Sequence, residues 1–235
     1  MNAIILVGGL GSRLGDLTKE TPKPLLPIRG KPFLLSLLEH LFNNGFSNVV
    51  LATGYKHNLV EEFIKNLPKN YNIPNIIFSK EDNILGTGGA IMQAINYVNS
   101  DFAFIFNGDT FIDINYDQFL KFHMKKNSNI SICANFIKEG TRYGSLKFDK
   151  SFRLLKMDTE TVKNSYINAG NYLIDITFMK ELKKTLPSHA FSFEDIVLRN
   201  MCKSIRISCF TSSTFFMDIG VLEDYKMAQE VLFNE

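Results

Sequence analysis

The sequence predicts an α/β protein with a doubly wound, mostly parallel central sheet and a small β-rich extension in its second half. Two observations predict this class. In the first half, strands that are apolar throughout alternate with amphipathic helices, which is typical of parallel sheets covered by helices on both faces. After about Asn129 the pattern changes to short, partly alternating strands with few helices between them.

The elements of the first half follow from their hydrophobic patterns. The apolar run at residues 3–7 predicts a buried strand. Residues 33–45 place five apolar side chains on one helical face, and Gly45 supplies a left-handed stop, so a helix is expected there. The five are Leu34, Leu37, Leu38, Leu41 and Phe42. The same reasoning predicts strands at 48–53, 75–78 and 102–106, and helices at 58–67 and 88–98.

The second half is expected to be rich in strands. The predicted strands lie at 130–137, 143–149, 151–158, 166–175, 205–210 and 213–218, and the predicted helices at 177–186, 191–201 and 223–233. No linker rich in proline or serine separates the halves. We therefore expect a single domain over 1–235, with halves at 1–128 and 129–235.

The composition excludes several classes of protein. Hydrophobic residues make up 45% of the chain, and the formal net charge is +2 at pH 7. The lysines are scattered, which argues against a nucleic-acid partner, and no apolar run approaches the ~20 residues of a membrane helix. The first strand begins without a leader segment, and Cys133, Cys202 and Cys209 lack CxxC spacing. We therefore expect a cytoplasmic protein with buried, reduced thiols and no membrane association.

A glycine-rich stretch, GGLGSRLGDLTKETPKP, follows the first strand. Glycines directly after a strand let backbone N–H groups approach an anion, and the start of a following helix adds a favourable dipole, so a phosphate site is predicted. The stretch is not a Walker A loop, because neither Lys19 nor Lys23 follows a glycine. It is not a dinucleotide fingerprint, because Leu14 stands where GxGxxG needs its last glycine.

The pattern GGxGxRL followed by Pro22-Lys23-Pro24 resembles the signature of the sugar-phosphate nucleotidyltransferases. Later blocks resemble that family's blocks in the expected order: LGTGGA at 85–90, NGDT at 107–110, INAGNYLI at 167–174 and MDIGVLEDY at 217–225. The resemblance covers essentially the whole chain. It implies a Rossmann-like nucleotidyltransferase fold, with a nucleotide-binding half at 1–128 and a sugar-binding half at 129–235.

Arg13 and Lys23 are the expected catalytic residues. In nucleotidyl transfer the α-phosphorus is attacked while pyrophosphate leaves in line, so catalysis is mainly positioning and charge neutralisation, without a protein nucleophile. The planar guanidinium of Arg13 suits the β- and γ-phosphates, and the compact charge of Lys23 suits the α-phosphate. Prolines on both sides are expected to hold Lys23 in an extended backbone.

Asp109 and Asp218 are the expected metal ligands. Each ends a predicted strand, at the edge where open α/β sheets bind ligands. Two carboxylates from strand ends can hold one Mg²⁺ between the α-phosphate and the sugar phosphate. The family resemblance implies the same role, which makes Mg²⁺ the expected cofactor.

The resemblance also implies which residues contact the substrates. Taken alone, the LGTGGA block is better explained as the start of a helix that Thr87 caps, whereas in the family it borders the base and ribose. The expected nucleotide contacts are Leu6, Gly8, Gly9, Gly11, Ser12, Arg13, Lys23, Gly86, Thr87, Gly88 and Asp109. The expected sugar contacts are Gly108, Asn168, Gly170, Asn171 and Glu194. A charge at a helix N-terminus explains Glu194 equally well.

One departure from the family pattern concerns the sugar phosphate. Family members often carry EKP before the NAG block, with the lysine near the sugar phosphate, whereas this chain has MDTETVKNSYINAG. Lys163 or Arg142 can substitute for that lysine, and the sequence does not decide between them.

The combined blocks are most similar to the branch that transfers guanylyl groups to mannose-configured sugars. This implies GTP and D-glycero-D-manno-heptose 1-phosphate as substrates, and GDP-heptose that supplies a surface glycan such as capsule or lipopolysaccharide. Small molecules are thus the expected partners, and a homodimer is compatible with the resemblance. The alternatives are a mannose 1-phosphate guanylyltransferase, another NDP-hexose pyrophosphorylase, a cytidylyltransferase acting on an alcohol phosphate, and a non-catalytic nucleotide-sensing paralogue. The last would have lost Arg13, Lys23, Asp109 or Asp218, and all four are present.

Overall fold

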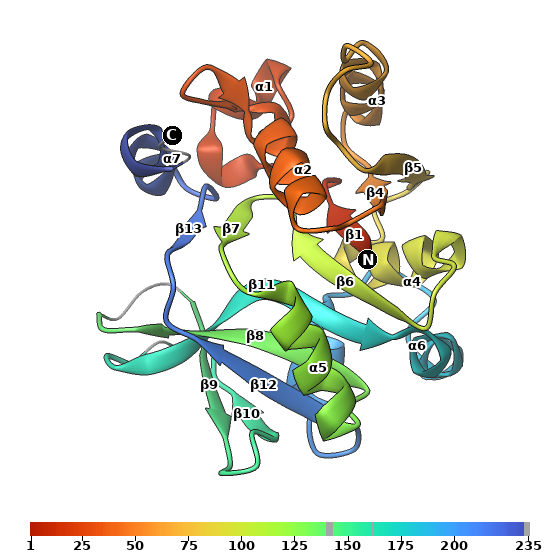
Figure 1. The fold of residues 1–235 in the computed structure, drawn as a ribbon, viewed down its shortest axis with the longest axis vertical. Helices are drawn as coiled ribbons and strands as arrows, with labels where there is room; N and C mark the ends of the chain where they lie inside the picture. Colours follow the sequence, from red (N-terminus) through yellow and green to blue (C-terminus); the bar gives the residue numbers. More distant parts are fainter. Residues whose placement is uncertain (140–142, 161, 233–235) are drawn as a thin grey trace.

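The computed structural model describes residues 1–139, 143–160 and 162–232. Within these ranges, nine strands form one mixed sheet (Figure 1). They are β1 Asn2–Leu6, β4 Asn48–Thr53, β5 Asn75–Lys80, β6 Phe102–Asn107, β8 Ile130–Ile137, β9 Ser145–Phe148, β10 Leu154–Met157, β11 Ser165–Asp175 and β12 Ile207–Ser212. The sheet confirms the predicted α/β class.

Four neighbouring parallel strands have the order β5-β4-β1-β6, and β12 pairs in parallel with β8 elsewhere in the sheet. Strand β1 lies in its middle, where Ile4 pairs with Val50 on one side and Ile105 on the other. Strand β11 then joins β6 in antiparallel orientation, and β8 and β9 both pair with β11. The strands of the two halves of the chain therefore belong to the same sheet.

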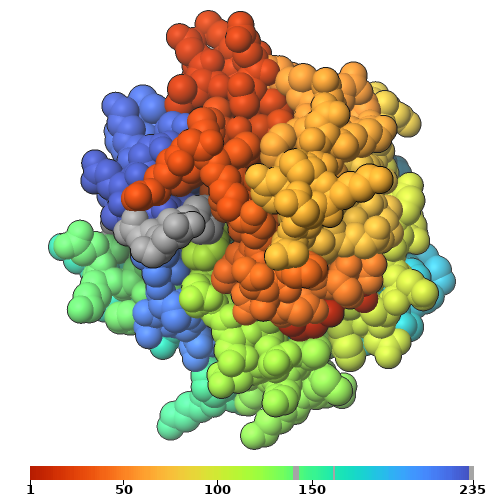
Figure 2. Space-filling model, turned by 45° about the horizontal axis from the view of Figure 1, so that its top comes forward, coloured from red at the N-terminus to blue at the C-terminus, as the bar shows by residue number. Residues whose placement is uncertain are grey.

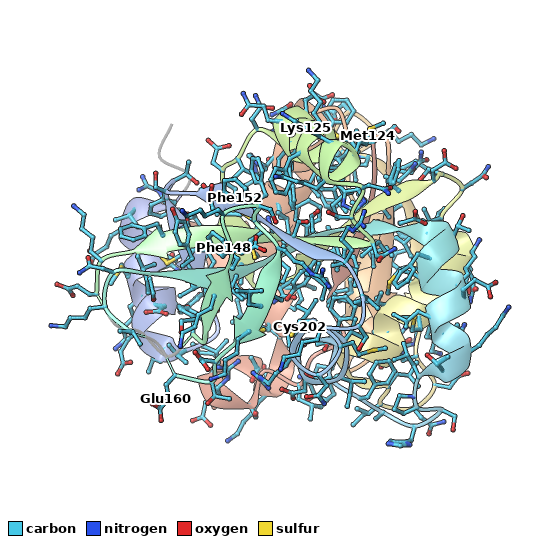
Figure 3. The ribbon with its side chains drawn as sticks, turned by 90° about the horizontal axis from the view of Figure 1, so that it is seen from below. Met124, Lys125, Phe148, Phe152, Glu160 and Cys202 are labelled. Atoms are coloured by element: carbon cyan, nitrogen blue, oxygen red, sulfur yellow. The ribbon has the colours of Figure 1, made fainter. Side chains whose placement is uncertain are left out.

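Helices cover both faces of the sheet, as predicted. One face packs against α2 Phe33–Asn43, α3 His57–Lys65 and α5 Tyr116–Lys126. The other packs against α4 Gly86–Ala94, α6 Ile176–Leu182 and the π-helical turn η5 Glu194–Arg199. The sequence analysis did not anticipate α5, which buries Phe119 on the sheet and leaves Met124 and Lys125 on its outer surface (Figure 3).

Helix α2 begins at the predicted residue and buries the predicted leucines, whereas Phe42, expected on the same face, is 41% exposed. Leu34, Leu37 and Leu41 are at most 2% exposed. The chain leaves the helix at Gly45 with φ 79°, in the left-handed region that glycine adopts without strain. Burying each such leucine contributes about 1.5–3 kcal/mol, so this face anchors the helix on the sheet.

The β9–β10 hairpin is the small extension expected in the second half. Its strands are antiparallel, and the rings of Phe148 and Phe152 stack with centroids 6.1 Å apart (Figure 3). The ammonium of Lys126 lies 5.0 Å from the centroid of the Phe152 ring, which links α5 to the hairpin. The three cysteines are free and buried, as expected.

The C-terminal helix packs beside the N-terminal segment. The remaining elements are α1 Leu17–Glu20, β2 Pro27–Ile28, β3 Lys31–Pro32, β7 Thr110–Ile112, β13 Phe216–Asp218 and α7 Leu222–Val231. Figure 2 shows the blue C-terminal segment against the red and orange N-terminal one. The Tyr225 hydroxyl and the Gln229 amide both donate to the Pro27 carbonyl, at 2.8 and 2.7 Å. Helix α7 thereby holds the segment that follows Pro22-Lys23-Pro24. In the described ranges, no helix has the length and apolar content of a membrane span.

Candidate active site

The glycine-rich loop leaves β1 at the carboxyl edge of the sheet and packs closely on its neighbours. The Val7 amide donates to Ala52 O at 2.9 Å, and the Gly108 amide donates to Leu6 O at 3.0 Å. A Cβ at Gly8 would lie only 2.9 Å from the backbone nitrogen of Gly54. The loop can lie this close to the loop after β4 because Gly8 has no side chain.

The end of the loop differs from the prediction of a following helix. Gly11 has φ 68°, and after it come only a 3₁₀ turn at Ser12–Leu14 and the single-turn helix α1. These elements are too short to present a sizeable helix dipole. The Arg13 side chain is exposed, and it makes no hydrogen bond or ion pair with the described residues. It is therefore available to an anion.

Lys23 is not in an extended backbone, as the flanking prolines had suggested. Pro22 is extended, with φ −63° and ψ 144°, but Lys23 begins a 3₁₀ turn that runs to Leu25, with Pro24 in its first turn. Proline is tolerated there because the first N–H groups of a helical turn have no partner within the turn. The turn buries Lys23 to 8% exposure and directs its ammonium to Asp109, with which it forms a salt bridge.

Asp109 and Asp218 are neighbours, but Asp218 does not end a strand of the central sheet as predicted: β13 forms a separate two-stranded sheet with β7. Strands β7 and β13 are antiparallel, with Asp218 opposite Thr110, and the Ile219 amide donates to Asp109 O at 2.9 Å. Asp218 is 8% exposed and accepts hydrogen bonds from the Tyr143 hydroxyl at 2.9 Å and the Gly220 amide at 2.5 Å. The sequence analysis did not anticipate Tyr143.

The Lys23 ammonium lies near both carboxylates. A Cβ placed on Gly220 would be 3.1 Å from Lys23 Nζ and 2.6 Å from Asp218 Oδ1, so both groups border that one point. The ammonium neutralises Asp109 directly through their salt bridge. Among the described residues, no group of three or more His, Cys, Asp or Glu side chains is arranged to hold a metal.

A pocket of ≈ 160 Å³ opens beside the glycine-rich loop. Five of the expected nucleotide contacts line it: Leu6, Gly8, Gly9, Gly86 and Thr87. The other lining residues are Leu10, Ala52, Glu81, Ile84 and Ala90, which sequence reasoning missed. Glu81 directly follows β5 as the structure defines it, whereas the strand predicted from the sequence ended at Phe78, so the sequence did not place Glu81 at a strand end.

The LGTGGA block forms the pocket wall in a different way from the predicted helix cap. Helix α4 begins at Gly86, which has φ 70°, and no side chain caps it. The Thr87 hydroxyl instead donates to Glu194 Oε2 at 2.7 Å and accepts from the Phe193 amide at 2.9 Å. Gly88 does not line the pocket: its amide donates to Phe191 O at 3.0 Å, and its missing side chain leaves room for the Phe191 ring.

Two of the expected sugar contacts are joined by hydrogen bonds through Tyr172. Asn168 Nδ2 donates to the Tyr172 hydroxyl at 2.8 Å, and this hydroxyl donates to Glu194 Oε1 at 3.2 Å. Burial, reinforced by the Glu194 carboxylate, raises the pKa of Tyr172 well above its usual value, so the hydroxyl keeps its proton. Glu194 is the first residue of η5, so its position agrees with both interpretations of the sequence.

Two other expected sugar contacts, Gly170 and Gly108, allow the backbone of this region to follow its path. Gly170 has φ 73°, and its amide donates to Asn168 Oδ1 at 3.0 Å, at an irregularity in the β11–β8 pairing. Gly108 packs on β1, where a Cβ would lie 2.4 Å from Leu6 O. Asn171 is 2% exposed, outside the hydrogen-bonded group of Asn168, Tyr172 and Glu194.

The basic residue for the sugar phosphate stays undecided. Lys163 is exposed just before β11. Arg142, the other candidate, lies outside the described residues.

These features form a candidate nucleotide site at the carboxyl edge of the parallel strands, with a glycine-rich loop, two basic residues and two adjacent acids. Residues 2–235 match the family model described as nucleotidyl transferase, and the chain belongs to that family.

Two curated relatives have the same name, D-glycero-α-D-manno-heptose 1-phosphate guanylyltransferase. The protein from Campylobacter jejuni is 35% identical over 96% of this chain and 97% of the relative. The one from Aneurinibacillus thermoaerophilus is 34% identical over 99% and 98%. The mannose-1-phosphate guanylyltransferase catalytic subunit beta of Drosophila melanogaster is 33% identical over 95% of this chain, which spans 60% of that protein.

A solved structure has the same fold. HddC from Yersinia pseudotuberculosis, complexed with GMP-PN, matches 97% of this chain and 98% of its own, with a TM-score of 0.83 and 32% identity.

Proposed function

We propose that this protein transfers GMP from GTP to D-glycero-α-D-manno-heptose 1-phosphate, giving GDP-heptose and pyrophosphate. The observation that carries the proposal is the near-complete match, in both directions, to two relatives that have this activity in their names. The pocket between the glycine-rich loop and α4 supports it, because its apolar walls and small residues suit a flat base.

The reaction is a direct in-line transfer. A phosphate oxygen of the sugar phosphate forms a bond to the α-phosphorus of GTP, and the bond from that phosphorus to the bridging oxygen breaks, so the electron pair leaves with pyrophosphate. Arg13, which is exposed and has no partner among the described residues, would bind the leaving phosphates. Lys23 would stabilise the charge that develops at the α-phosphate.

Asp109 and Asp218 fit a Mg²⁺ ion. Both supply hard oxygen donors, and the pairing of β7 with β13 brings them together. Among the described residues, no third acid joins this pair. A Mg²⁺ ion would therefore complete its coordination with substrate phosphates and water, as Mg²⁺ commonly does in proteins. When bound, Mg²⁺ would neutralise phosphate charge.

Removal of one carboxylate tests this metal site. Asp109→Asn should weaken Mn²⁺ binding in the presence of GTP, measured by electron paramagnetic resonance, and lower turnover by roughly 10²-fold or more. Asp113→Asn is the control, because that side chain is 71% exposed on the same segment. Unchanged Mn²⁺ binding in Asp109→Asn would show that Asp109 is not a metal ligand.

The alternative acceptor is mannose 1-phosphate, which the similarity to the Drosophila protein favours. Pyrophosphate release with GTP, ATP, UTP, CTP and dTTP, each paired with the heptose and the mannose 1-phosphates, separates the possibilities. We expect the highest kcat/KM for GTP with the heptose. A higher kcat/KM for another base or for mannose 1-phosphate would contradict this assignment. Binding of GTP without turnover would indicate a nucleotide sensor.

The proposal extends to the setting of the enzyme. We place it in the cytoplasm, where its three free thiols stay reduced, with its product supplying a surface glycan. A homodimer would be tested by light scattering at the protein concentration of the assay.

A further inference from the structure

Lys56, in the loop between β4 and α3, binds the end of helix α1. Its ammonium donates to Thr18 O at 3.1 Å and also to Lys19 O. In a longer helix the backbone N–H four residues later would donate to the Thr18 carbonyl, but that residue is Pro22, which has no N–H. The Lys56 ammonium therefore supplies a donor that the sequence of α1 lacks.

The backbone of Lys56 is unusual for a lysine. It has φ 54° and ψ 34°, in the left-handed region where glycine and asparagine are favoured. Residues held in such a conformation often have a function that depends on their side chain. The bonds from the Lys56 ammonium to α1 are such a function, because they join two segments that are distant in sequence.

The loop after β4 thereby holds the glycine-rich stretch at two points. The Tyr55 amide donates to Gly8 O at 3.2 Å, near the beginning of the stretch, and Lys56 binds α1 further along. The Lys56 ammonium also lies 5.2 Å from the centroid of the Tyr55 ring, a contact that restrains the lysine. Arg13 lies in the chain between the two points.

Hydrogen bonds within the glycine-rich stretch connect α1 to Arg13. The Thr18 hydroxyl shares its proton between Gly11 O and Gly15 O, at 3.1 and 3.2 Å. These two glycines flank the 3₁₀ turn Ser12–Leu14 that contains Arg13. A Cβ at Gly11 would be 2.8 Å from Thr18 Cγ2, so the turn packs closely on α1. A shift of α1 would therefore move the backbone of Arg13.

Arg13 depends on its backbone for its position. Its side chain is exposed and makes no hydrogen bond or ion pair with the described residues. The reach of the guanidinium is thus set by where the turn lies. If the turn were free to move, binding of an anion would cost the entropy of ordering it.

We infer that Lys56 is a positioning residue whose bonds to α1 hold Arg13 in place for the β- and γ-phosphates of the nucleotide. The inference rests on the proposed function, because it identifies the support of a residue that binds the leaving phosphates. Lys56 acts through Arg13 and not through a contact of its own with the nucleotide.

A double-mutant cycle of Lys56→Met and Arg13→Met tests this inference. Lys56→Met keeps most of the apolar stem and removes the ammonium. We expect it to lower kcat/KM for GTP about 10-fold, because small misplacements of a binding group are costly, and to leave the KM for the sugar phosphate unchanged. In the Arg13→Met background, the same substitution should have little further effect, because residues that act as a unit are not additive.

Binding measurements give a readout that does not depend on turnover. GMP lacks the β- and γ-phosphates, so in equilibrium dialysis Lys56→Met should weaken binding of GTP and leave binding of GMP unchanged. Lys56→Arg retains N–H donors for the two carbonyls and should restore the affinity for GTP. Lys65→Met is the matched control, because this lysine of α3 is 67% exposed and pairs with Glu61. It should keep the wild-type affinity for both nucleotides.

Lys56→Gly is a second variant without the ammonium, and glycine adopts the left-handed backbone of this position without strain. Thermal unfolding should show both variants folded, and both should lose affinity for GTP but not for GMP. Unchanged affinity for GTP in these variants, or an equal loss in the Arg13→Met background, would overturn the inference alone. A wild type that binds GTP without transfer would overturn the proposed function, and the comparison of GTP with GMP would still decide the role of Lys56. A wild type that binds neither nucleotide would overturn both.

Discussion

At the scale of single residues, Lys23 stabilises a pair of acids that the fold places side by side. Buried carboxylates need a cation or donors, and the Lys23 ammonium binds Asp109 and borders Asp218. The proposed reaction uses the same ammonium at the α-phosphate. A metal ion bound at Asp109, as proposed, would replace Lys23 as the partner of this carboxylate and leave the ammonium free to contact the phosphate.

Replacing Lys23 tests this exchange of partners. Lys23→Met keeps most of the apolar stem but removes the charge. We expect Mn²⁺ to bind the nucleotide-free protein more tightly than it binds wild type, because no ammonium competes for Asp109, while kcat falls roughly 10²-fold or more. Lys31→Met, which breaks a lysine bridge to Glu39 instead, should change neither quantity. Equal Mn²⁺ affinity in Lys23→Met and wild type would contradict the exchange.

At the scale of elements, the start of α4 is joined to η5 by side chains. Thr87 bonds Glu194, and Glu194 also accepts from Tyr172 in β11. Three elements, distant in sequence, thereby fix one carboxylate between the base pocket and the expected sugar site. The orientation of Glu194 depends on these bonds, since a carboxylate on a short turn has other rotamers available.

Thr87→Val removes the hydroxyl and keeps the shape of the side chain. The Phe193 amide then loses its acceptor, so we expect unfolding free energy to fall by about 1–3 kcal/mol. The KM for the sugar phosphate should rise more than the KM for GTP, because Glu194 loses the Thr87 donor and, among the described residues, is held only by those from Tyr172 and Ser192. Thr87→Ser retains the hydroxyl and should resemble wild type in urea unfolding and in both KM values. An unchanged KM for the sugar phosphate in Thr87→Val would show that Glu194 does not contribute to sugar binding.

The glycines of the pocket wall are not equivalent. Gly86 has φ 70°, and a Cβ there would lie 2.5 Å from Phe191 O, whereas a Cβ at Gly9 meets nothing within 4 Å. We expect Gly86→Ala to lower the unfolding free energy by about 1–3 kcal/mol through strain and overpacking. Gly9→Ala should stay within about 0.5 kcal/mol of wild type, as for an unhindered surface substitution. Equal losses in the two variants, measured by urea unfolding, would refute this distinction.

At the scale of the whole molecule, a buried histidine makes the fold sensitive to acid. His123 in α5 is 1% exposed, and its Nδ1 lies 2.8 Å from Ser131 Oγ. Burial lowers the pKa of His123 to about 4, although Asp175 acts in the opposite direction. Between its ordinary pKa and this lowered one, the unfolded chain binds a proton that the folded protein excludes. Stability is therefore full above the ordinary pKa and is lost as the pH falls toward about 4.

The histidine contribution can be measured by urea unfolding at pH 7 and pH 4. Protonation in the unfolded state alone should cost the wild type up to about 3 kcal/mol between these values. His123→Gln should lose less stability over the same interval, because its side chain does not titrate. His189→Gln, at an exposed position, should keep the wild-type pH dependence. An identical pH dependence in His123→Gln would assign the acid sensitivity to other groups.

The sequence predicted most elements, because its strands and helices have clear periods. Strand β4 and the start of α2 fall at the predicted residues. Helix α5 was missed, although three aligned residues form its buried face: Tyr116, Phe119 and His123. The helix is polar on average, and a search for helical periods among apolar residues gives little weight to a tyrosine and a histidine. The short turns around Lys23 were missed because their stability comes from tertiary contacts.

By itself, the sequence determined the α/β class, the glycine-rich loop after the first strand and the acids at two strand ends, since each depends on neighbouring residues or on a local period. It also carried the family motifs. Only the tertiary structure decided that Lys23 binds Asp109, that Thr87 bonds Glu194 instead of capping α4, and that Glu81 lines the nucleotide pocket. Each of these depends on which strands and turns lie side by side, and contacts between distant segments leave no periodic signal in a single sequence.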